Sequence, residues 1–442
     1  MGTRLRRLLW SWWVWAAMAV VLLRVDSSGW AGVTAALAVV ARLTERRVHP
    51  PRFGLDHEVG CDSVEFLATV AGATGTPFVA GNQVEMLHNG DAFYPRMLED
   101  IRQAETSICI EAYIYWAGEV GTQFAAALDE RAKAGVRVMA LLDAVGAADI
   151  GDEILRTLEA HCEVAWYNPL RWRTIGSFNN RTHRKSLIID GEIGYTGGAG
   201  IADHWRGQAR NPSEWRDMQV RFAGPAVAGL QSGFAHNWQR TTGELISGGA
   251  FYPPVPECGP YAVQVILSSP ETGGSNVQTL YYLSIAGARR SIVIANPYFV
   301  PDEVGLALLI DAARRGVAVR VMVSGIRNDN WLARVNGIAL YGALLEAGIV
   351  VHEYDRSILH HKVMVVDGVW MTIGTTNFDS RSFAHNEESN LAVFDAGIAG
   401  AFERQFAADL DACRGVTLEA WRKRGLLQQG GELIARFFED QV

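Results

Sequence analysis

Short apolar runs alternate with longer amphipathic stretches along most of the chain. Residues 107–115 form an apolar run, residues 124–133 mix alanine with charged side chains at helical spacing, and residues 136–142 are apolar again. Such short runs are typical of buried β-strands, and Gly135 stands where a glycine often ends a helix. The pattern therefore predicts a strand–helix–strand unit.

The second half of the chain repeats this unit in the same order. Residues 291–299 form the first apolar run, 303–315 the helical stretch and 317–323 the second run, with Gly316 after the helix. Such self-similarity indicates an internal duplication. Alternating strands and helices joined by right-handed crossovers predict an α/β fold with two pseudo-symmetric α/β/α sandwich lobes.

The domain organisation follows from the repeat and from a proline-rich segment. We expect a first lobe at 75–247, a second lobe at 260–415 and a linker at 248–259, which contains three prolines. The pattern of residues 416–442 predicts a helical extension that packs against a lobe.

Two further apolar runs, residues 8–23 and 30–41, lie in an N-terminal segment at 1–50. Arginines precede the first run and follow the second, so a helical hairpin would place both basic clusters on the cytoplasmic side of a membrane. The first run is shorter than the roughly 20 residues that span a bilayer. We expect a membrane hairpin or anchor, with an interfacial helix or a cleaved export signal as the alternatives.

The composition limits the partners of the protein. The chain has 442 residues, of which 49% are hydrophobic, and a net charge of −8. It can therefore form a large core, but it has no overall attraction for the phosphates of nucleic acid. Its five cysteines are scattered and lack the spacing of a zinc site. We expect neither a nucleic-acid partner nor a bound metal.

One polar motif occurs once in each half, at equivalent positions of the repeat. It comprises His183, Lys185 and Asp190 in the first half and His360, Lys362 and Asp367 in the second. Because side chains alternate along a strand, the His and the Lys of each copy lie on one face. A single copy arises by chance in on the order of 1% of chains of this length, whereas two copies at equivalent positions indicate a common function.

An imidazole beside an ammonium group suits the cleavage of phosphodiesters. One histidine can attack phosphorus to give a covalent phosphohistidine, while the other protonates the departing alcohol and later deprotonates the incoming alcohol or water. The lysines neutralise charge on the nonbridging oxygens. Because these cations supply what Mg²⁺ supplies elsewhere, we expect the reaction to need no metal or other cofactor.

The second motif and the residues after it resemble the phospholipase D superfamily. The motif is followed by the turn Gly374-Thr-Thr-Asn377 and then by Glu388. The resemblance implies that the Asn377 amide contacts the substrate phosphate and that the Glu388 carboxylate orients the imidazole of this motif.

The first motif departs from the superfamily at one position. Its turn reads Gly197-Gly-Ala-Gly200, with Gly200 where the superfamily commonly has Asn. Farther along, Asp217 resembles the superfamily's carboxylate for the first histidine. The resemblance therefore implies that Asp217 orients His183.

Within the superfamily, the chain resembles the bacterial cardiolipin synthases from about residue 75 to residue 412. The segments that carry this likeness are 81–87, 224–228 and 296–302, together with the N-terminal apolar runs. The likeness implies an enzyme of the bacterial inner membrane, with its lobes on the cytoplasmic face. It would move a phosphatidyl group from one phosphatidylglycerol to the hydroxyl of another and release glycerol.

Several alternatives stay open at this point. Hydrolysis of phospholipids uses the same first step, with water in place of the acceptor alcohol. The acidic net charge counts against a nuclease, and two intact His-Lys pairs count against a noncatalytic binding protein. Analogy with the superfamily favours His183 as the nucleophile and His360 as the acid.

Overall fold

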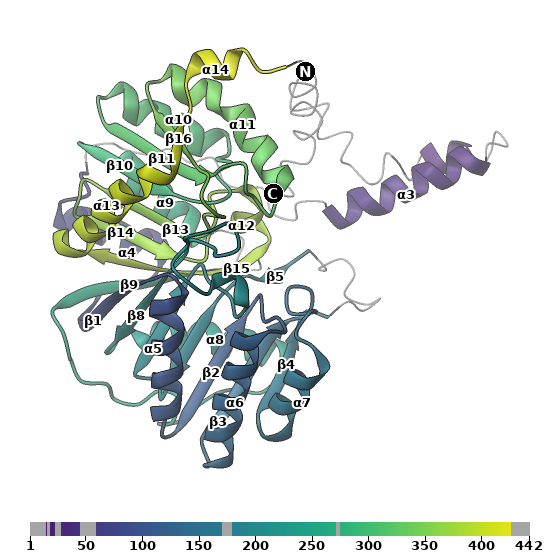
Figure 1. The fold of residues 1–442 in the computed structure, drawn as a ribbon, viewed down its shortest axis with the longest axis vertical. Coiled ribbons are helices and arrows are strands. Elements are labelled where there is room, and N and C mark those ends of the chain that lie inside the picture. The colour runs from purple at the N-terminus through teal and green to yellow at the C-terminus, as the bar shows by residue number, and fades with distance from the viewer. Residues whose placement is uncertain are drawn as a thin grey trace.

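The computed structural model describes residues 15, 18–22, 28–44, 59–169, 179–270 and 275–425. Within these residues the chain forms a mixed α/β structure in which sixteen strands belong to one sheet. Figure 1 shows two lobes, one above the other, with helices packed around the strands of each.

The strands of the first half are β1 (Val79–His88), β2 (Ser107–Ala112), β3 (Arg137–Asp143), β4 (Glu163–Tyr167), β5 (Arg181–Thr182), β6 (Ser186–Ile189), β7 (Ile193–Gly197) and β8 (Met218–Ala223). Its helices are α4 (Val64–Thr74), α5 (Gly90–Gln103), α6 (Glu119–Lys133), α7 (Asp152–His161) and α8 (Val227–Thr242), with a 3-10 turn at Asp203–Trp205.

The strands of the second half are β9 (Tyr261–Ser268), β10 (Ser291–Ala295), β11 (Ala318–Ser324), β12 (Val350–Tyr354), β13 (Lys362–Val366), β14 (Trp370–Gly374), β15 (Asn386–Phe394) and β16 (Cys413–Gly415). Its helices are α9 (Asn276–Ala286), α10 (Glu303–Arg314), α11 (Trp331–Glu346), α12 (Ser380–Ala384), α13 (Ala396–Asp409) and α14 (Leu418–Arg422), with a 3-10 turn at Leu410–Ala412.

The two halves have the same strand order. From its outer edge inward, the first half runs β4-β3-β2-β6-β7-β8-β1 and the second runs β12-β11-β10-β13-β14-β15-β9, with β16 outside β12. β2 is parallel to β3, and β10 is parallel to β11. Helices α6 and α10 connect these parallel pairs. The predicted strand–helix–strand units and the mixed α/β fold are confirmed.

The halves are joined more closely than two separate sandwiches would be. β9 pairs with β15 on one side and with β1 on the other, so the strands form a continuous path from one lobe to the other. Because an unpaired sheet edge exposes backbone hydrogen-bonding groups, pairing the inner edges satisfies both halves. One apolar cluster also contains residues of both halves, including Phe234 of α8 and Phe402 of α13.

The chain outside the lobes is described only in part. The second N-terminal apolar run lies in α3 (Ser28–Thr44), whereas most of the first run lies outside the described residues. Of the helices in the described part, none has both the length and the apolar character to cross a membrane. At the other end, Trp421 of α14 donates a hydrogen bond from Nε1 to the carbonyl oxygen of Ile338 at 2.8 Å, and residues 426–442 lie outside the described part.

Asp190 and Asp367, predicted as site residues, lie at the ends of β6 and β13 away from the histidines. The Asp190 carboxylate accepts hydrogen bonds from the backbone N–H groups of residues 105–107 at 2.7–3.2 Å. The Asp367 carboxylate accepts the equivalent bonds from residues 289–291 over the same distances. Each residue has positive φ, 54° and 55°, in a tight turn before a glycine. Their placement in the catalytic site is therefore corrected: they tie a hairpin turn to the start of the adjacent strand.

We expect Asp190→Asn and Asp367→Asn each to lower the free energy of unfolding by about 1.5–3 kcal/mol, because each removes a carboxylate that accepts several backbone hydrogen bonds. Asparagine tolerates the left-handed backbone, so strain adds little. Urea unfolding followed by circular dichroism measures the change. Asp311→Asn, on the exposed surface of α10, serves as the control. Unchanged unfolding midpoints in both variants would contradict the structural role.

Candidate active site

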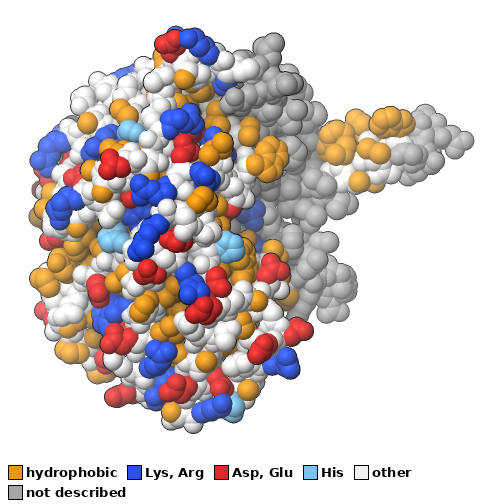
Figure 2. Space-filling view, viewed as in Figure 1, with side chains coloured by type: hydrophobic (Ala, Val, Ile, Leu, Met, Phe, Trp, Pro, Cys, Tyr) orange, Lys and Arg blue, Asp and Glu red, His pale blue; other side chains and the backbone are white. Residues whose placement is uncertain are grey.

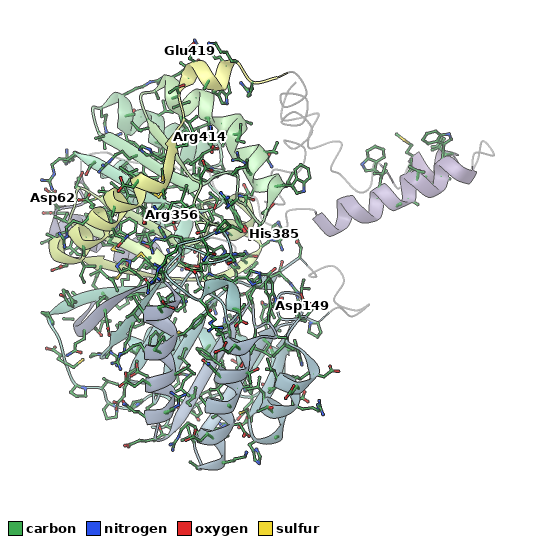
Figure 3. All side chains as sticks on the ribbon, viewed as in Figure 1. Asp62, Asp149, Arg356, His385, Arg414 and Glu419 are labelled. Atoms are coloured by element: carbon green, nitrogen blue, oxygen red, sulfur yellow. The ribbon has the colours of Figure 1, made fainter. Side chains whose placement is uncertain are left out.

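A cavity of 250 Å³ lies between the halves and contains both predicted histidines. In the described part of the chain its lining residues are Tyr113, Ile114, His183, Lys185, Tyr298, Asp329, Asn330, His360, Asn377, Asp379, Arg381, Ser382 and Asn386. Lys362 is buried behind His360, with Nζ 3.3 Å from the imidazole Nε2. Figure 3 shows the side chains packed between the lobes, where His385 is labelled. The two motifs thus face one common space.

Each histidine is paired with a carboxylate from the other half. His183 Nδ1 lies 3.0 Å from Glu388 Oε1, and His360 Nδ1 lies 2.9 Å from Asp217 Oδ2. The prediction had joined Asp217 to His183 and Glu388 to the histidine of its own motif. That pairing is wrong, and the correct one is crosswise.

Backbone contacts between the halves bring about the crosswise pairing. β5 pairs in parallel with the first residues of β15, and the N–H of His183 donates to the carbonyl oxygen of Glu387 at 2.9 Å. In the same way, the N–H of His360 donates to the carbonyl oxygen of Arg216 at 2.8 Å. Each histidine therefore lies beside the residue that precedes its carboxylate in the sequence.

The two carboxylates have different surroundings. Asp217 also accepts a hydrogen bond from Trp205 Nε1 at 2.7 Å. Burial raises the pKa of Asp217, but the hydrogen bond from His360 and the nearby Lys362 outweigh this effect, so the pKa lies below its ordinary value. Glu388 accepts hydrogen bonds from the Thr375 hydroxyl and the Asn386 amide, and burial raises its pKa. Asp217 is the more firmly ionised of the two.

The two imidazoles differ correspondingly. Burial, followed by the charge of Lys185, holds the pKa of His183 well below its ordinary value. Burial and Lys362 also lower the pKa of His360, but the bond to Asp217 opposes them. His183 is therefore kept neutral, whereas His360 has a partner that favours its protonated form.

Both lysines are buried; Lys185 lines the cavity, whereas Lys362 lies against the imidazole of His360. Lys185 Nζ donates to the carbonyl oxygen of His183 at 2.9 Å, and Lys362 Nζ donates to that of His360 at 2.5 Å. Burial lowers the pKa of Lys362 to about 8, and burial together with the charge of Lys362 lowers that of Lys185. An anionic ligand in the cavity would raise the pKa of both lysines and so favour their charged forms, which suits the recognition of a phosphodiester.

Close packing explains why the turn after the first motif lacks an asparagine. A Cβ atom at Gly200 would lie 2.8 Å from the Cβ atom of Ile114, and one at Gly198 would lie 2.2 Å from Asp217 Oδ1. Neither position accepts a side chain without displacing a neighbour. In the second turn Asn377 lines the cavity, and its Oδ1 is buried with no hydrogen-bond partner among the described residues.

Most of the remaining lining residues were not predicted from the sequence. Tyr113, Ile114 and Tyr298 follow the ends of β2 and β10, while Asp329 and Asn330 follow β11. The carboxyl ends of parallel strands are where α/β sheets bind ligands, and this rule is the signal that could have identified them. Arg381, Ser382 and Asn386 lie in the stretch after Asn377 that carries the superfamily resemblance, but their spacing alone gives no role.

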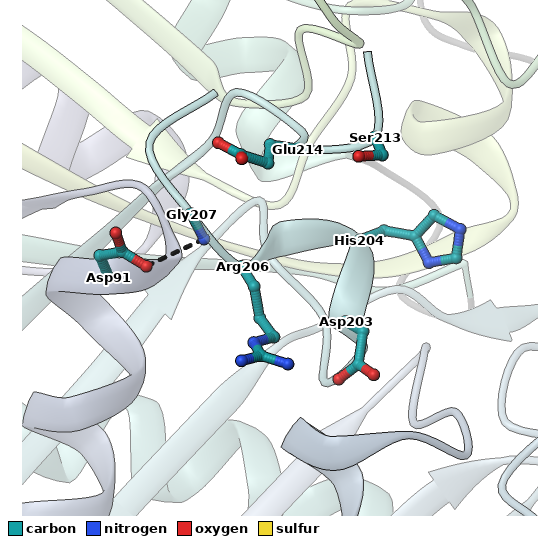
Figure 4. A pocket seen from close by; sticks show the side chains of 7 residues that line it. All are labelled: Asp91, Asp203, His204, Arg206, Gly207, Ser213 and Glu214. Atoms are coloured by element: carbon teal, nitrogen blue, oxygen red, sulfur yellow. Dashed lines mark hydrogen bonds between the residues drawn. The ribbon is translucent and has the colours of Figure 1, made fainter. Parts of the chain in front are cut away.

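A second, more open cavity of 520 Å³ is lined by Asp91, Asp203, His204, Arg206, Gly207, Ser213 and Glu214 (Figure 4). Its carboxylates hold the local backbone. Asp91 accepts a hydrogen bond from the N–H of Gly207, Asp203 accepts from the first N–H groups of α6, and Glu214 accepts from two N–H groups of its own loop. Neither motif reaches this cavity.

Comparison with known proteins identifies the family. Residues 97–206 and 282–410 match the family described as cardiolipin synthase, PLD-like domain. Cardiolipin synthase 2 of Staphylococcus epidermidis is 33% identical over 362 residues, which cover 80% of this chain and 73% of that protein. The chain belongs to the cardiolipin synthase family of phosphatidyltransferases. The cardiolipin synthase of Geobacillus kaustophilus is likewise 34% identical over 364 residues, covering 81% of this chain and 72% of the relative.

Solved structures support the fold of this family member. The crystal structure of phosphatidylserine synthase from Haemophilus influenzae superposes with a TM-score of 0.63 and covers 85% of this chain and 99% of that one. The sequence identity is 14%, so the likeness concerns the fold. The duplicated arrangement of the cardiolipin synthase-like chain is therefore shared with a protein of very different sequence.

Proposed function

We propose that the chain transfers a phosphatidyl group from one phosphatidylglycerol to the hydroxyl of a second through a phosphohistidine, and releases glycerol. The observation that carries this proposal is the cavity that His183, Lys185 and His360 line together, with Lys362 buried against the His360 imidazole. The names of the relatives, which are cardiolipin synthases, support phosphatidylglycerol as donor and acceptor.

In the first step His183 attacks phosphorus. Its Nδ1 faces Glu388, so Nε2 carries the lone pair that forms the bond to phosphorus. The bond between phosphorus and the glycerol oxygen breaks, and His360 gives that oxygen a proton from Nε2 while Asp217 stabilises the imidazolium. The depressed pKa of His183 and the ionised partner of His360 favour this division of roles over its reverse.

In the second step the acceptor hydroxyl takes the place of the departed glycerol. His360 removes its proton, the oxygen attacks phosphorus, and the bond to His183 breaks. Lys185 and the Asn377 amide, which line the cavity, and Lys362, which is buried against His360, stabilise the nonbridging oxygens throughout by charge and by hydrogen bonding. Hydrolysis would follow the same path with water, so the products decide between the two activities.

With labelled phosphatidylglycerol in mixed micelles, the purified chain should form a dimeric lipid and glycerol. His183→Ala and His360→Ala should each lower the rate by roughly 10³-fold or more, because each removes a reacting group. Thin-layer chromatography and mass spectrometry identify the products. His161→Ala, which alters a surface histidine bonded to Asp129, is the control. Phosphatidic acid as the sole product would replace transfer with hydrolysis.

The assignment of the nucleophile can be tested with phosphatidyl-p-nitrophenol, whose leaving group needs no proton. His360→Ala should release about one equivalent of nitrophenolate per enzyme molecule and then stall, because the acceptor lacks a base. His183→Ala should release none. Rapid-mixing absorbance measures the burst, and a burst in His183→Ala alone would exchange the two roles.

We further propose that the chain works on the cytoplasmic face of the bacterial inner membrane, attached through its N-terminal segment. Trp30, Val33 and Leu37 of α3 are exposed, Trp30 to 68%, whereas Ala31, Thr34 and Ala38, on an adjacent stripe of the helix, are buried. Figure 2 shows apolar side chains on this projecting helix, while acidic and basic side chains are interspersed over the lobes. Ile326 and Trp331, beside the cavity residues Asp329 and Asn330, are also exposed. Exposed apolar side chains of this kind suit a lipid surface.

Removing residues 1–44 should move the protein from the membrane fraction to the supernatant of bacterial lysates, since the exposed apolar face of α3 goes with them. Centrifugation after a high-salt wash, followed by immunoblotting, measures the distribution. Equal sedimentation of the full and shortened chains would show that another surface holds the membrane.

A further inference from the structure

The two sides of the cavity differ, although the halves that form them are related by duplication. Tyr298 stands seven positions after Ser291, the first residue of β10, as Ile114 stands seven positions after Ser107, the first residue of β2. Asp329 stands thirteen positions after the helix-ending Gly316, and the residue thirteen positions after Gly135 is Ala148. A phenol and a carboxylate thus occupy positions where the first half has two aliphatic residues.

The phenol and the carboxylate form one unit beside His360. The Tyr298 hydroxyl donates a hydrogen bond to Asp329 Oδ2. The Tyr298 ring lies edge-on to the His360 imidazole, with 6.4 Å between centroids. Both Tyr298 and Asp329 line the cavity, as does Asn330, whose side chain caps α11. The loop after β11 is therefore anchored where it presents the Asp329 carboxylate to the cavity.

The ring contact between Tyr298 and His360 places this unit on the His360 side of the cavity, and the electrostatic effects agree with it. The pKa of Lys362 is lowered by burial, and Asp217 and Asp329 are the leading charges that oppose this effect. Burial is the main cause of the lowered pKa of His183. Arg381, a lining residue from the other half, lowers it further through its positive charge. Asp329 therefore acts on the His360 side of the cavity and Arg381 on the His183 side.

The proposed function gives these two sides different chemical groups to bind. In a displacement by His183, the alcohol that leaves and the alcohol that attacks both lie beside His360, which exchanges protons with their oxygen. In phosphatidylglycerol this alcohol is a glycerol group with a second hydroxyl next to the reacting one. The diacylglycerol part of the donor stays bonded to phosphorus in both steps.

We propose that Asp329, positioned by Tyr298, determines acceptor specificity by accepting a hydrogen bond from the hydroxyl adjacent to the one that reacts. A carboxylate makes a strong hydrogen bond to a hydroxyl, and an alcohol without the second hydroxyl leaves that carboxylate without its partner. A water molecule has one oxygen and cannot place it at phosphorus and also offer a second hydroxyl to Asp329 as a diol does, so the same contact favours transfer over hydrolysis. This inference rests on the proposed function and names the residue that selects its acceptor.

Competition between acceptor alcohols tests the inference. The full chain is given phosphatidylglycerol in mixed micelles with equal concentrations of labelled glycerol and labelled 1-propanol, and the ratio of the two labelled lipids is measured. The wild type should favour glycerol. Asp329→Asn should lower the ratio at least tenfold, and Tyr298→Phe should lower it less, because the carboxylate remains but loses its positioning hydroxyl. Asp329→Glu should restore part of the preference.

Glu346→Gln, at the far end of α11 and paired with Arg422 on the surface, is the matched control and should leave the ratio unchanged. If Asp329→Asn gives the same ratio of labelled lipids as the wild type, the inference is overturned. This includes the case in which the rates with glycerol and with 1-propanol fall by the same factor. If the wild type makes neither labelled lipid nor the dimeric lipid, the proposed function itself fails. The two failures are therefore distinguishable.

Discussion

The site depends on two hydrogen bonds that cross between the halves, from His183 to Glu388 and from His360 to Asp217. Neither half contains a complete His–carboxylate pair of this site, because each supplies an imidazole to one pair and a carboxylate to the other. The imidazole tautomers, and hence the nitrogen atoms available to a substrate, are fixed only when the lobes are packed together. The continuous strand path through β9 and β1 holds the lobes in that relation.

Buried ion pairs reinforce this arrangement around the cavity. Arg184, between the two motif residues of the first half, bonds to Glu387 of the second half at 2.8 Å. Arg216, next to Asp217, bonds to Asp409 of α13 at 2.9 Å. Burying such charges is costly, and an unpaired member would be strongly destabilising. The pairs therefore favour the one packing of the halves in which every charge has its partner, which is also the packing that forms the site.

Duplication gives the cavity two similar sides, and a few substitutions make them chemically different. Thr375 supports one carboxylate through its hydroxyl, whereas the equivalent Gly198 leaves room for the other, which Trp205 supports instead. The result is one imidazole kept neutral and one with an ionised partner. In a symmetric site either imidazole could take either role, so the departures from symmetry are what favour His183 as the proposed nucleophile and His360 as the proposed acid.

The sequence alone determined the features that depend on local order. The strand–helix–strand repeat follows from hydrophobic periodicity over short windows, and the two His-Lys pairs follow from the two-residue spacing of each pair in the segments that lead into β6 and β13. The sequence pattern could not show the role of Asp190, because the same motif spacing fits a catalytic residue and a turn residue. Its hydrogen bonds with residues 105–107 show that it is a turn residue.

Only the tertiary structure decided which carboxylate meets which histidine and how Tyr298 reaches Asp329. The paired side chains of His183 and Glu388 are 205 positions apart, and those of His360 and Asp217 are 143 apart. No hydrophobic periodicity in the sequence relates residues that are so many positions apart. These pairs are set by the register of β5 against β15 and by the packing of one lobe on the other, which arise from the sum of many contacts rather than from any local pattern.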